Sequence, residues 1–178
     1  MQKALKKIYQ ALPFKKQLFS FLKLIHTPSE KIYQHLYFKG PFTIRVADSQ
    51  MKMMHYGYQL ENEIFWEGLT GRWERQSMNI WMQLSKKAKV VLDIGANTGV
   101  FSLVSKTLNP SAKVFAFEPV KRVFEKLQKN VSLNNYDIVC YPCAVSNRSG
   151  EASFYDTNSE HTYTVVIDKD LSHNKMYY

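Results

Sequence analysis

The sequence predicts an α/β fold, in which helices flank a doubly wound, Rossmann-like parallel sheet. Residues 89–101 contain a short apolar run, a turn with Gly95 and Gly99, and then an apolar helical stretch. A second apolar run, Val114–Phe117, ends in an acidic residue and a proline, and a third covers Ile138–Tyr141. Strand-length apolar runs that alternate with helix-length amphipathic segments are typical of parallel sheets with helical crossovers.

Residues 1–41 are expected to form a basic helical extension. Residues 2–12 and 14–25 each carry apolar side chains at helical spacing, and Pro13 separates them. Two interpretations are open. Residues 1–26 make a peripheral contact with an anionic membrane, or the helices pack on the rest of the chain and expose a lysine face. The apolar run 18–22 is too short to span a bilayer.

Between this extension and the glycine turn, the sequence predicts a short helix, a hairpin and two longer helices. Ser29 is placed to cap the short helix, which would end near Phe38. Phe42–Ala47 alternates apolar and polar residues, as a half-buried strand does, and residues 51–58 are its expected partner. The longer helices are expected at 60–69 and at 73–85, the second with a face made of Trp73, Ser77, Ile80, Trp81 and Leu84.

The glycine turn should be followed by two crossover helices. Thr98 is the expected N-cap of the first, and the second should run to about residue 133, where Asn134 and Asn135 end it. Right-handed crossovers then give the strand order third–second–first. Short strands are expected at 152–156 and 162–167.

The charge beside the glycine turn indicates which ligand it holds. Asp93 lies two residues before Gly95, where its carboxylate would repel the pyrophosphate of a dinucleotide. Asn97 replaces the middle glycine of a dinucleotide loop. A cationic ligand suits these residues better, and S-adenosylmethionine carries both a sulfonium and an ammonium group.

A second carboxylate, Glu118, ends the second strand. It is placed to accept hydrogen bonds from both ribose hydroxyls of an adenosine. The alternative is that Glu118 only starts the next helix, where an acid favours the dipole. Cys140 and Cys143 form a C-x-x-C in a strand context, which disfavours redox or metal chemistry. We expect Cys143 and Ala144 to line an adenine pocket, and no metal site. His55 is expected to be structural.

Length and composition fit one domain in the cytoplasm. The chain has 178 residues and only two cysteines, so a disulfide scaffold is not expected. Its formal charge is +9, and the first 45 residues hold nine basic residues and one acidic residue, Glu30. A nucleic-acid-binding protein would carry that charge around its ligand cleft, so we expect no nucleic-acid partner.

The stretch Val91–Gly99, followed by Phe117-Glu118-Pro119, resembles the FkbM-type family of S-adenosylmethionine-dependent methyltransferases, and the likeness spans about residues 70–156. The resemblance implies a class I methyltransferase fold and methylation of a hydroxyl group on a sugar, glycan or other small molecule. It also implies that Glu74 is the acidic residue such proteins place before the first strand, and we name it as the candidate catalytic residue. The expected cofactor-binding residues are Asp93, Gly95, Ala96, Asn97, Gly99, Glu118, Pro119, Cys143 and Ala144.

The sequence departs from the family at its C-terminal end. Residues 157–178 do not match the fourth strand and acidic motif of the family, so we expect an incomplete fold and a truncated N-terminal portion. The methyltransferase domain is assigned to residues 42–178, with a core at 88–156. Two alternatives stay open: an inactive remnant that serves only as a binding or membrane-associated module, and a dinucleotide oxidoreductase, which Asp93 and Asn97 disfavour.

Overall fold

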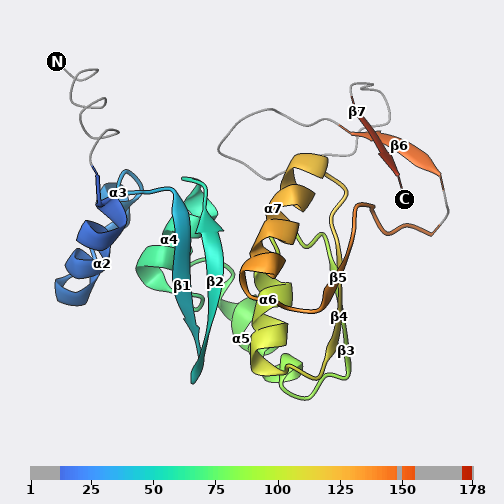
Figure 1. The fold of residues 1–178 in the computed structure, drawn as a ribbon, viewed down its shortest axis with the longest axis horizontal. Helices are drawn as coiled ribbons and strands as arrows, with labels where there is room; N and C mark the ends of the chain where they lie inside the picture. The colour runs from blue at the N-terminus through green and yellow to red at the C-terminus, as the bar shows by residue number, and fades with distance from the viewer. Residues whose placement is uncertain (1–12, 148–149, 155–173, 178) are drawn as a thin grey trace.

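The computed structural model describes residues 13–147, 150–154 and 174–177, and in these residues two sheets enclose a pair of helices (Figure 1). On one side is an antiparallel hairpin of β1 (Gly40–Val46) and β2 (Ser49–His55). On the other is a parallel sheet of β3 (Val90–Ile94), β4 (Lys113–Phe117) and β5 (Ile138–Tyr141). Between them lie α6 (Val100–Leu108) and α7 (Lys121–Leu133).

The parallel sheet confirms the predicted mixed α/β fold and the predicted strand order, with β4 between β3 and β5. Ile94 pairs with Phe117, and Phe117 pairs with Tyr141, so the last residues of all three strands are aligned at one edge. That edge is where the loop after each strand begins, and ligands of open α/β sheets bind there.

One face of this sheet packs on helices and the other does not. Val91, Val114, Ala116 and Ile138 are buried, as is the apolar stripe of α7. The alternate residues Val90, Leu92 and Ile94 are 55–60% exposed, and among the described residues no helix covers their side of the sheet (Figure 1). The described residues therefore show one helical layer of the expected doubly wound sheet.

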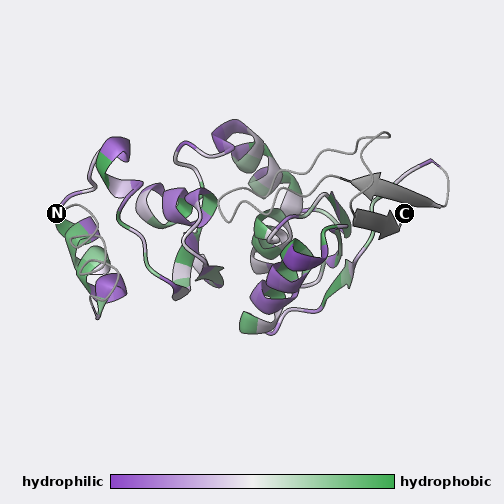
Figure 2. Ribbon diagram, turned by 90° about the horizontal axis from the view of Figure 1, so that it is seen from above, coloured by the Kyte–Doolittle hydropathy of each residue, from purple (hydrophilic) through white to green (hydrophobic). Residues whose placement is uncertain are grey.

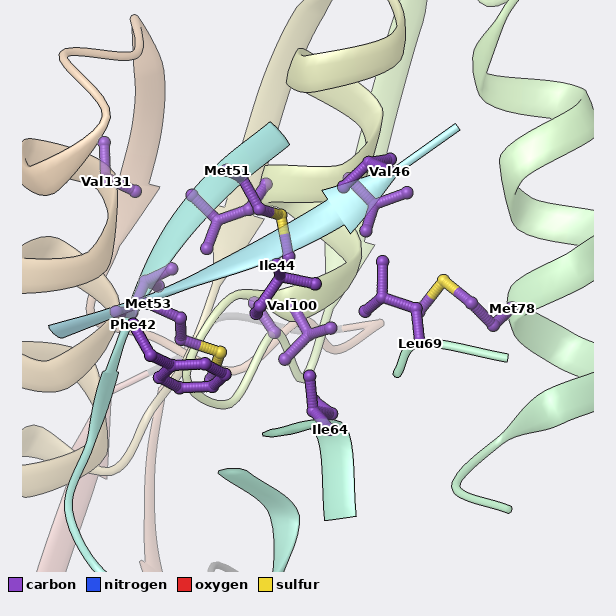
Figure 3. Packing of buried hydrophobic residues seen from close by; sticks show 14 of the residues in the cluster. Phe42, Ile44, Val46, Met51, Met53, Ile64, Leu69, Met78, Val100 and Val131 are labelled. Carbon is purple, nitrogen blue, oxygen red and sulfur yellow. The ribbon is translucent and has the colours of Figure 1, made fainter. Parts of the chain in front are cut away.

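The hairpin packs on the opposite side of α6 and α7 through an apolar cluster (Figure 3). Its inward side chains are Phe42, Ile44, Val46, Met51 and Met53, all at most 4% exposed. Two amides on α7 also bind β2. Asn130 Oδ1 accepts the Met54 N–H at 2.8 Å, and Asn134 Oδ1 accepts the Lys52 N–H at 2.7 Å. These bonds fix the hairpin on the helix that follows β4.

In the part of the chain that the structure describes, four further helices precede the parallel sheet: α2 (Lys15–Ile25), α3 (Glu30–Tyr33), α4 (Gln59–Glu67) and α5 (Arg75–Ser85). α3 is shorter than predicted, and Ser29 occupies its N-cap position without a side-chain hydrogen bond. The predicted apolar face of α5 is wrong, because Ile80 and Leu84 are 60% and 65% exposed. Met78 and Ser85 are the buried residues of that helix, and Trp81 donates to the Phe101 carbonyl of α6 at 2.9 Å.

A second antiparallel pair, β6 (Glu151–Phe154) and β7 (Asn174–Tyr177), closes the described chain. β6 confirms most of the strand expected at 152–156, whereas β7 was not predicted. The expected helix at 2–12 and the expected strand at 162–167 lie outside the described residues. Within the described residues, no helix has the length and apolar character needed to cross a membrane.

Candidate functional site

The loop between β3 and α6 confirms the predicted glycine turn. Gly95, Asn97 and Gly99 have φ of 76°, 52° and 88°, in the left-handed region that glycine and asparagine tolerate. A β-carbon on Gly99 would lie 2.5 Å from Leu127 Cδ1, so only glycine fits against α7. A β-carbon on Gly95 would meet nothing within 4 Å. The backbone at Gly95 is therefore open to an approaching ligand.

The strand next to β3 holds this loop in place. The Gly95 and Ala96 N–H groups both donate to the Phe117 carbonyl at 2.9 Å. The Glu118 N–H in turn donates to the Tyr141 carbonyl at 3.0 Å. Backbone bonds thus connect the carboxyl ends of all three strands, and the loop does not depend on a ligand for its hydrogen bonds.

Asp93 is 7% exposed and is bound by one residue of α6. Its Oδ2 accepts the Ser102 backbone N–H at 3.0 Å and the Ser102 hydroxyl at 2.6 Å. Burial raises the pKa of Asp93, and the two bonds from Ser102 oppose that rise. Sequence reasoning did not name Ser102 as a partner of Asp93. The nine-residue separation from Asp93, about the length of a tight turn and one helical turn, was the available signal.

Glu118 connects the glycine turn to the start of α7. Its Oε2 accepts the Asn97 N–H and its Oε1 accepts the Val120 N–H, both at 2.9 Å. Burial raises the pKa of Glu118, while these two N–H groups lower it. Nearby Asp93 adds a smaller repulsion that also raises this pKa. Glu118 lies two residues before Val120, the N-cap residue of α7, whose first turn holds no acidic residue, and its carboxylate also binds the glycine turn. Starting the next helix is therefore not its whole role.

Thr98 does not cap α6 as predicted, because Gly99 occupies the N-cap position and no side chain caps the helix. The Thr98 hydroxyl is instead buried without a hydrogen-bond partner. The Thr98 backbone is held by two asparagines. Asn97 Oδ1 accepts its N–H at 2.7 Å, and Asn130 Nδ2 donates to its carbonyl at 2.8 Å. Asn130 therefore joins the loop to the hairpin, a connection that the sequence pattern did not reveal.

The candidate catalytic residue, Glu74, lies at the N-cap of α5 and is exposed. Its φ of 46° is left-handed, which is unusual for a glutamate. The preceding residue, Trp73, has its ring 5.5 Å from that of Phe101, the second residue of α6. Glu74 therefore lies near the helix that begins at the glycine turn.

The remaining predicted residues follow β4 and β5. Pro119, Cys143 and Ala144 are each half-buried. Burial raises the pKa of the neighbouring Cys140 thiol to about 11, so it is not a thiolate at neutral pH. Among the described residues, no group of three His, Cys, Asp or Glu side chains is arranged to bind a metal ion.

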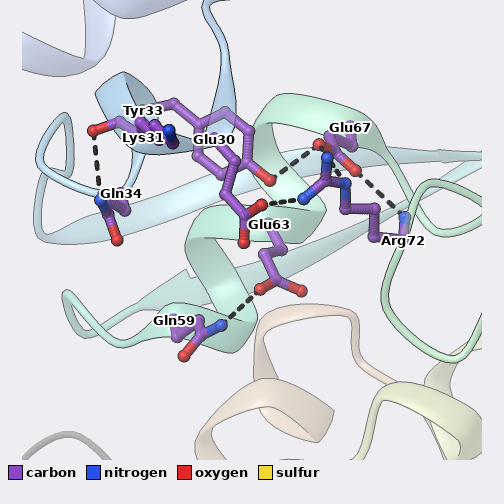
Figure 4. A network of polar contacts seen from close by, with 8 residues as sticks. All are labelled: Glu30, Lys31, Tyr33, Gln34, Gln59, Glu63, Glu67 and Arg72. Carbon is purple, nitrogen blue, oxygen red and sulfur yellow. Dashed lines mark hydrogen bonds and ion pairs between the residues drawn. The ribbon is translucent and has the colours of Figure 1, made fainter.

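A cavity of about 530 Å³ lies apart from this loop, between α3, the end of β2 and α4. Polar side chains line it, and they bind one another (Figure 4). Arg72 pairs with Glu30, the Tyr33 hydroxyl donates to Glu67 at 2.7 Å, and Gln59 donates to Glu63 at 2.6 Å. These mutual bonds make the cavity wall a stable polar network that holds α3 on α4.

Comparisons with known proteins agree with the sequence resemblance. Residues 93–177 match the methyltransferase FkbM domain. The methyltransferase sdnD of Sordaria araneosa is 33% identical over 90 residues, which cover 49% of this chain and 34% of that protein. The 2-O-methyltransferase NoeI of Sinorhizobium fredii is 32% identical over 78 residues, covering 43% of this chain and 31% of that protein. The chain spans about a third of the length of these two relatives.

Among solved structures, the S-adenosylmethionine-dependent methyltransferase of Agrobacterium tumefaciens aligns over 59% of this chain and 33% of that one, with a TM-score of 0.42 and 14% identity. The tRNA (uracil-54, C5)-methyltransferase of Pyrococcus abyssi aligns over 62% of this chain and 25% of that one, with a TM-score of 0.42 and 17% identity.

Proposed function

We propose that this chain is a member of the FkbM-type family of methyltransferases, that it binds S-adenosylmethionine at the loop after β3, and that it methylates a hydroxyl group of a sugar or other small molecule. One observation carries the cofactor assignment. The Glu118 carboxylate, at the end of β4, accepts the Asn97 N–H of the glycine turn at 2.9 Å. This bond holds the carboxylate that we propose binds the adenosine directly beside an open backbone loop.

The residues at the loop fit such a cofactor. Each carboxylate oxygen of Glu118 accepts one backbone N–H, and an ionised carboxylate has about four acceptor sites. Acceptor capacity therefore remains for two ribose hydroxyls. Asp93 places a second buried acid close by, which favours a cationic ligand over a pyrophosphate. The open space above Gly95 leaves room for the ribose or for the cationic end of the cofactor.

S-adenosylmethionine supplies an electrophilic methyl carbon when bound. The chain contributes chiefly by alignment, because holding a substrate oxygen in line with that carbon is worth up to about 7–11 kcal/mol in model systems. Gly95, Ala96, Asn97 and Gly99 would contact the cofactor through their backbone, with Pro119, Cys143 and Ala144 beside the adenine. An alcohol is a weak nucleophile, so a base should accept its proton. We assign this role to Glu74, an exposed residue at the N-cap of α5, next to Trp73, whose ring lies 5.5 Å from that of Phe101 on α6.

The kind of acceptor is proposed from the relatives. NoeI is named a 2-O-methyltransferase, and sdnD is named a methyltransferase. An oxygen acceptor on a sugar or another small molecule agrees with the first name. We propose that residues 42–178 form the methyltransferase domain, with a core at 88–156, and that residues 1–41 form an extension. Both cysteines are free, in keeping with the reducing cytoplasm that we propose as its location.

A methyl-transfer assay tests the proposed reaction. The chain is incubated with S-adenosylmethionine that carries a labelled methyl group and with a panel of sugars, other alcohols and amines. We expect label on a hydroxyl oxygen, and expect Glu74→Gln to slow the transfer without weakening cofactor binding. Glu125→Gln, an exposed acid on α7, is the control and should react at the wild-type rate. Cofactor binding with transfer to none of these acceptors would support the inactive binding module, and transfer only to amines would contradict O-methylation.

A further inference from the structure

The N-terminal helix α2 packs on the rest of the chain through one face only. Phe19 is 4% exposed, and its ring lies 5.8 Å from that of Trp66 on α4. Lys23 lies on the same side, where its ammonium donates to the Phe65 carbonyl and is 5.3 Å from the centre of the Phe65 ring. Burial lowers the pKa of Lys23. Lys23 thus helps to hold α2 against α4.

The opposite face of α2 is apolar and exposed. Figure 2 shows the helix as largely hydrophobic, at one end of the molecule. Phe14 is the N-cap residue of α2, and Leu18, Phe21 and Ile25 follow on the helix at i, i+3 and i+7, so that the last three side chains form one stripe along it. The exposures of these four residues are 72%, 57%, 62% and 69%, and Leu24 beside them is 85% exposed. α2 therefore packs on the rest of the chain, as the packing alternative expects, but its outward face is mainly apolar and is not the lysine face of that alternative.

A stripe of this kind needs a partner, because large adjoining apolar side chains in water lower stability and promote association. The surrounding charge indicates which partner fits. Lys16 on α2 and Lys31 on α3 are exposed, and in the sequence the first 45 residues hold nine basic residues against one acidic residue. A symmetric contact between two copies would bring these like charges together, at a cost. An anionic lipid surface attracts them and accepts the apolar stripe.

We propose that α2 docks this chain on an anionic membrane surface by inserting Phe14, Leu18, Phe21 and Ile25 between the lipid headgroups. α2 has 11 residues and is therefore about 16 Å long, so it lies in the plane of the interface. The face that carries Phe19 and Lys23 stays against α4, so the helix keeps its place on the chain when it binds lipid. Such docking holds the chain at the bilayer and is independent of the methyl-transfer reaction.

Vesicle cosedimentation of the full 178-residue chain tests the proposal. The probes are phosphatidylcholine vesicles with and without about 30% phosphatidylserine. We expect the partition coefficient to rise at least tenfold with the anionic lipid. Equal binding to both vesicle types would overturn the electrostatic part of the proposal, and binding to neither would overturn all of it.

Matched double variants locate the surface. Leu18→Gln with Phe21→Gln removes two side chains that are 57% and 62% exposed. Ile80→Gln with Leu84→Gln removes two on α5 that are 60% and 65% exposed. All four side chains are exposed, so both variants should keep the wild-type circular dichroism. We expect the first variant to lower the partition coefficient at least tenfold and the second by less than twofold. Equal losses would contradict a specific role for α2.

Sedimentation velocity without lipid tests the other possible partner of the apolar stripe, which is a second copy of this chain. We expect a monomer at micromolar concentration in both variants and in the wild type. A wild-type dimer that is lost only in the Leu18→Gln, Phe21→Gln variant would overturn the lipid proposal in favour of self-association.

Discussion

Glu118 at the end of β4 accepts the backbone N–H of Asn97, in the loop after β3, at 2.9 Å. The bond joins the carboxyl ends of two neighbouring parallel strands through a side chain. Its other oxygen accepts the Val120 N–H at the start of α7. The residue proposed to bind the ribose therefore also fixes the loop and the helix on either side of it, so that ligand affinity and loop order depend on the same carboxylate.

Replacing Glu118 by Gln should weaken S-adenosylmethionine binding at least tenfold. The amide nitrogen of glutamine cannot accept an N–H, so one of the two backbone bonds is lost together with the charge. Hydrogen bonds to a charged group contribute about 1.5–3 kcal/mol, which corresponds to roughly ten- to 150-fold in affinity. Isothermal titration calorimetry measures the change, with Glu125→Gln as the control. Wild-type affinity in Glu118→Gln would exclude a direct role for this carboxylate.

Replacing Ser102 by Ala should destabilise the fold through Asp93. The substitution removes the 2.6 Å hydroxyl bond and leaves the buried carboxylate with one donor from α6. The pKa of Asp93 should rise further, because that bond opposes the effect of burial. We expect the free energy of unfolding in urea to fall by about 1–3 kcal/mol. Ser132→Ala, on the exposed side of α7, is the control, and an equally small change in both variants would show that the Ser102 bond contributes nothing.

His55 should make the chain less stable in mild acid. It is fully buried, and its Nδ1 accepts the Gly57 N–H at 3.0 Å, so the neutral ring carries its proton on Nε2, facing Asn62. Burial lowers the pKa of His55 to about 4, against about 6.5 in the unfolded chain. The unfolded state therefore binds more protons between these two values, and stability falls as the pH drops through that window. Over the whole window the free energy of unfolding falls by about 3 kcal/mol, at about 1.4 kcal/mol per pKa unit.

Urea unfolding from pH 7 to pH 4 measures this dependence, and an NMR titration of the His55 ring provides a direct check. The control variant is His26→Gln, at an exposed histidine at the end of α2. A His55 ring that protonates near pH 6.5 in the folded chain would contradict the expected neutral state.

Replacing Glu74 by Gly should stabilise the chain and slow methyl transfer. Glycine adopts the left-handed φ of 46° without the cost of about 1–2 kcal/mol that a side chain incurs, although its greater freedom when unfolded offsets part of this gain. Asn135→Gly, at a φ of 53° after α7, is the control for stability and should not affect transfer. Thermal unfolding and the labelled-methyl assay give the two readouts. Unchanged transfer in Glu74→Gly would remove Glu74 from the reaction.

The sequence predicted the parallel sheet and the two helices that connect its strands, because the patterns of these elements are local. Short apolar runs predict β3, β4 and β5, and apolar residues at helical spacing predict the buried face of α7. The glycines predict the turn after β3. The strand order followed from the handedness of the crossovers.

The sequence did not predict the contacts that depend on packing between distant segments. Asn130 joins the hairpin to the glycine turn across 76 and 32 positions in the chain, and nothing in the residues near it indicates either partner. The face of α5 was wrong because its apolar side chains do not all face α6, and Met78 rather than Ile80 is buried. Apolar side chains occur on both faces of α2, so the sequence does not show which face is buried. The contact between Phe19 and Trp66, on another helix, determines it.

Calorimetric titration of the 178-residue chain with S-adenosylmethionine, with NADH as the comparison, tests the central assignment most directly. The arrangement of Asp93 and Glu118 around the open loop predicts saturable binding of S-adenosylmethionine and no binding of NADH. Binding of NADH alone would contradict the charge argument from Asp93, and a folded chain that binds neither would contradict the assignment of the loop as a cofactor site.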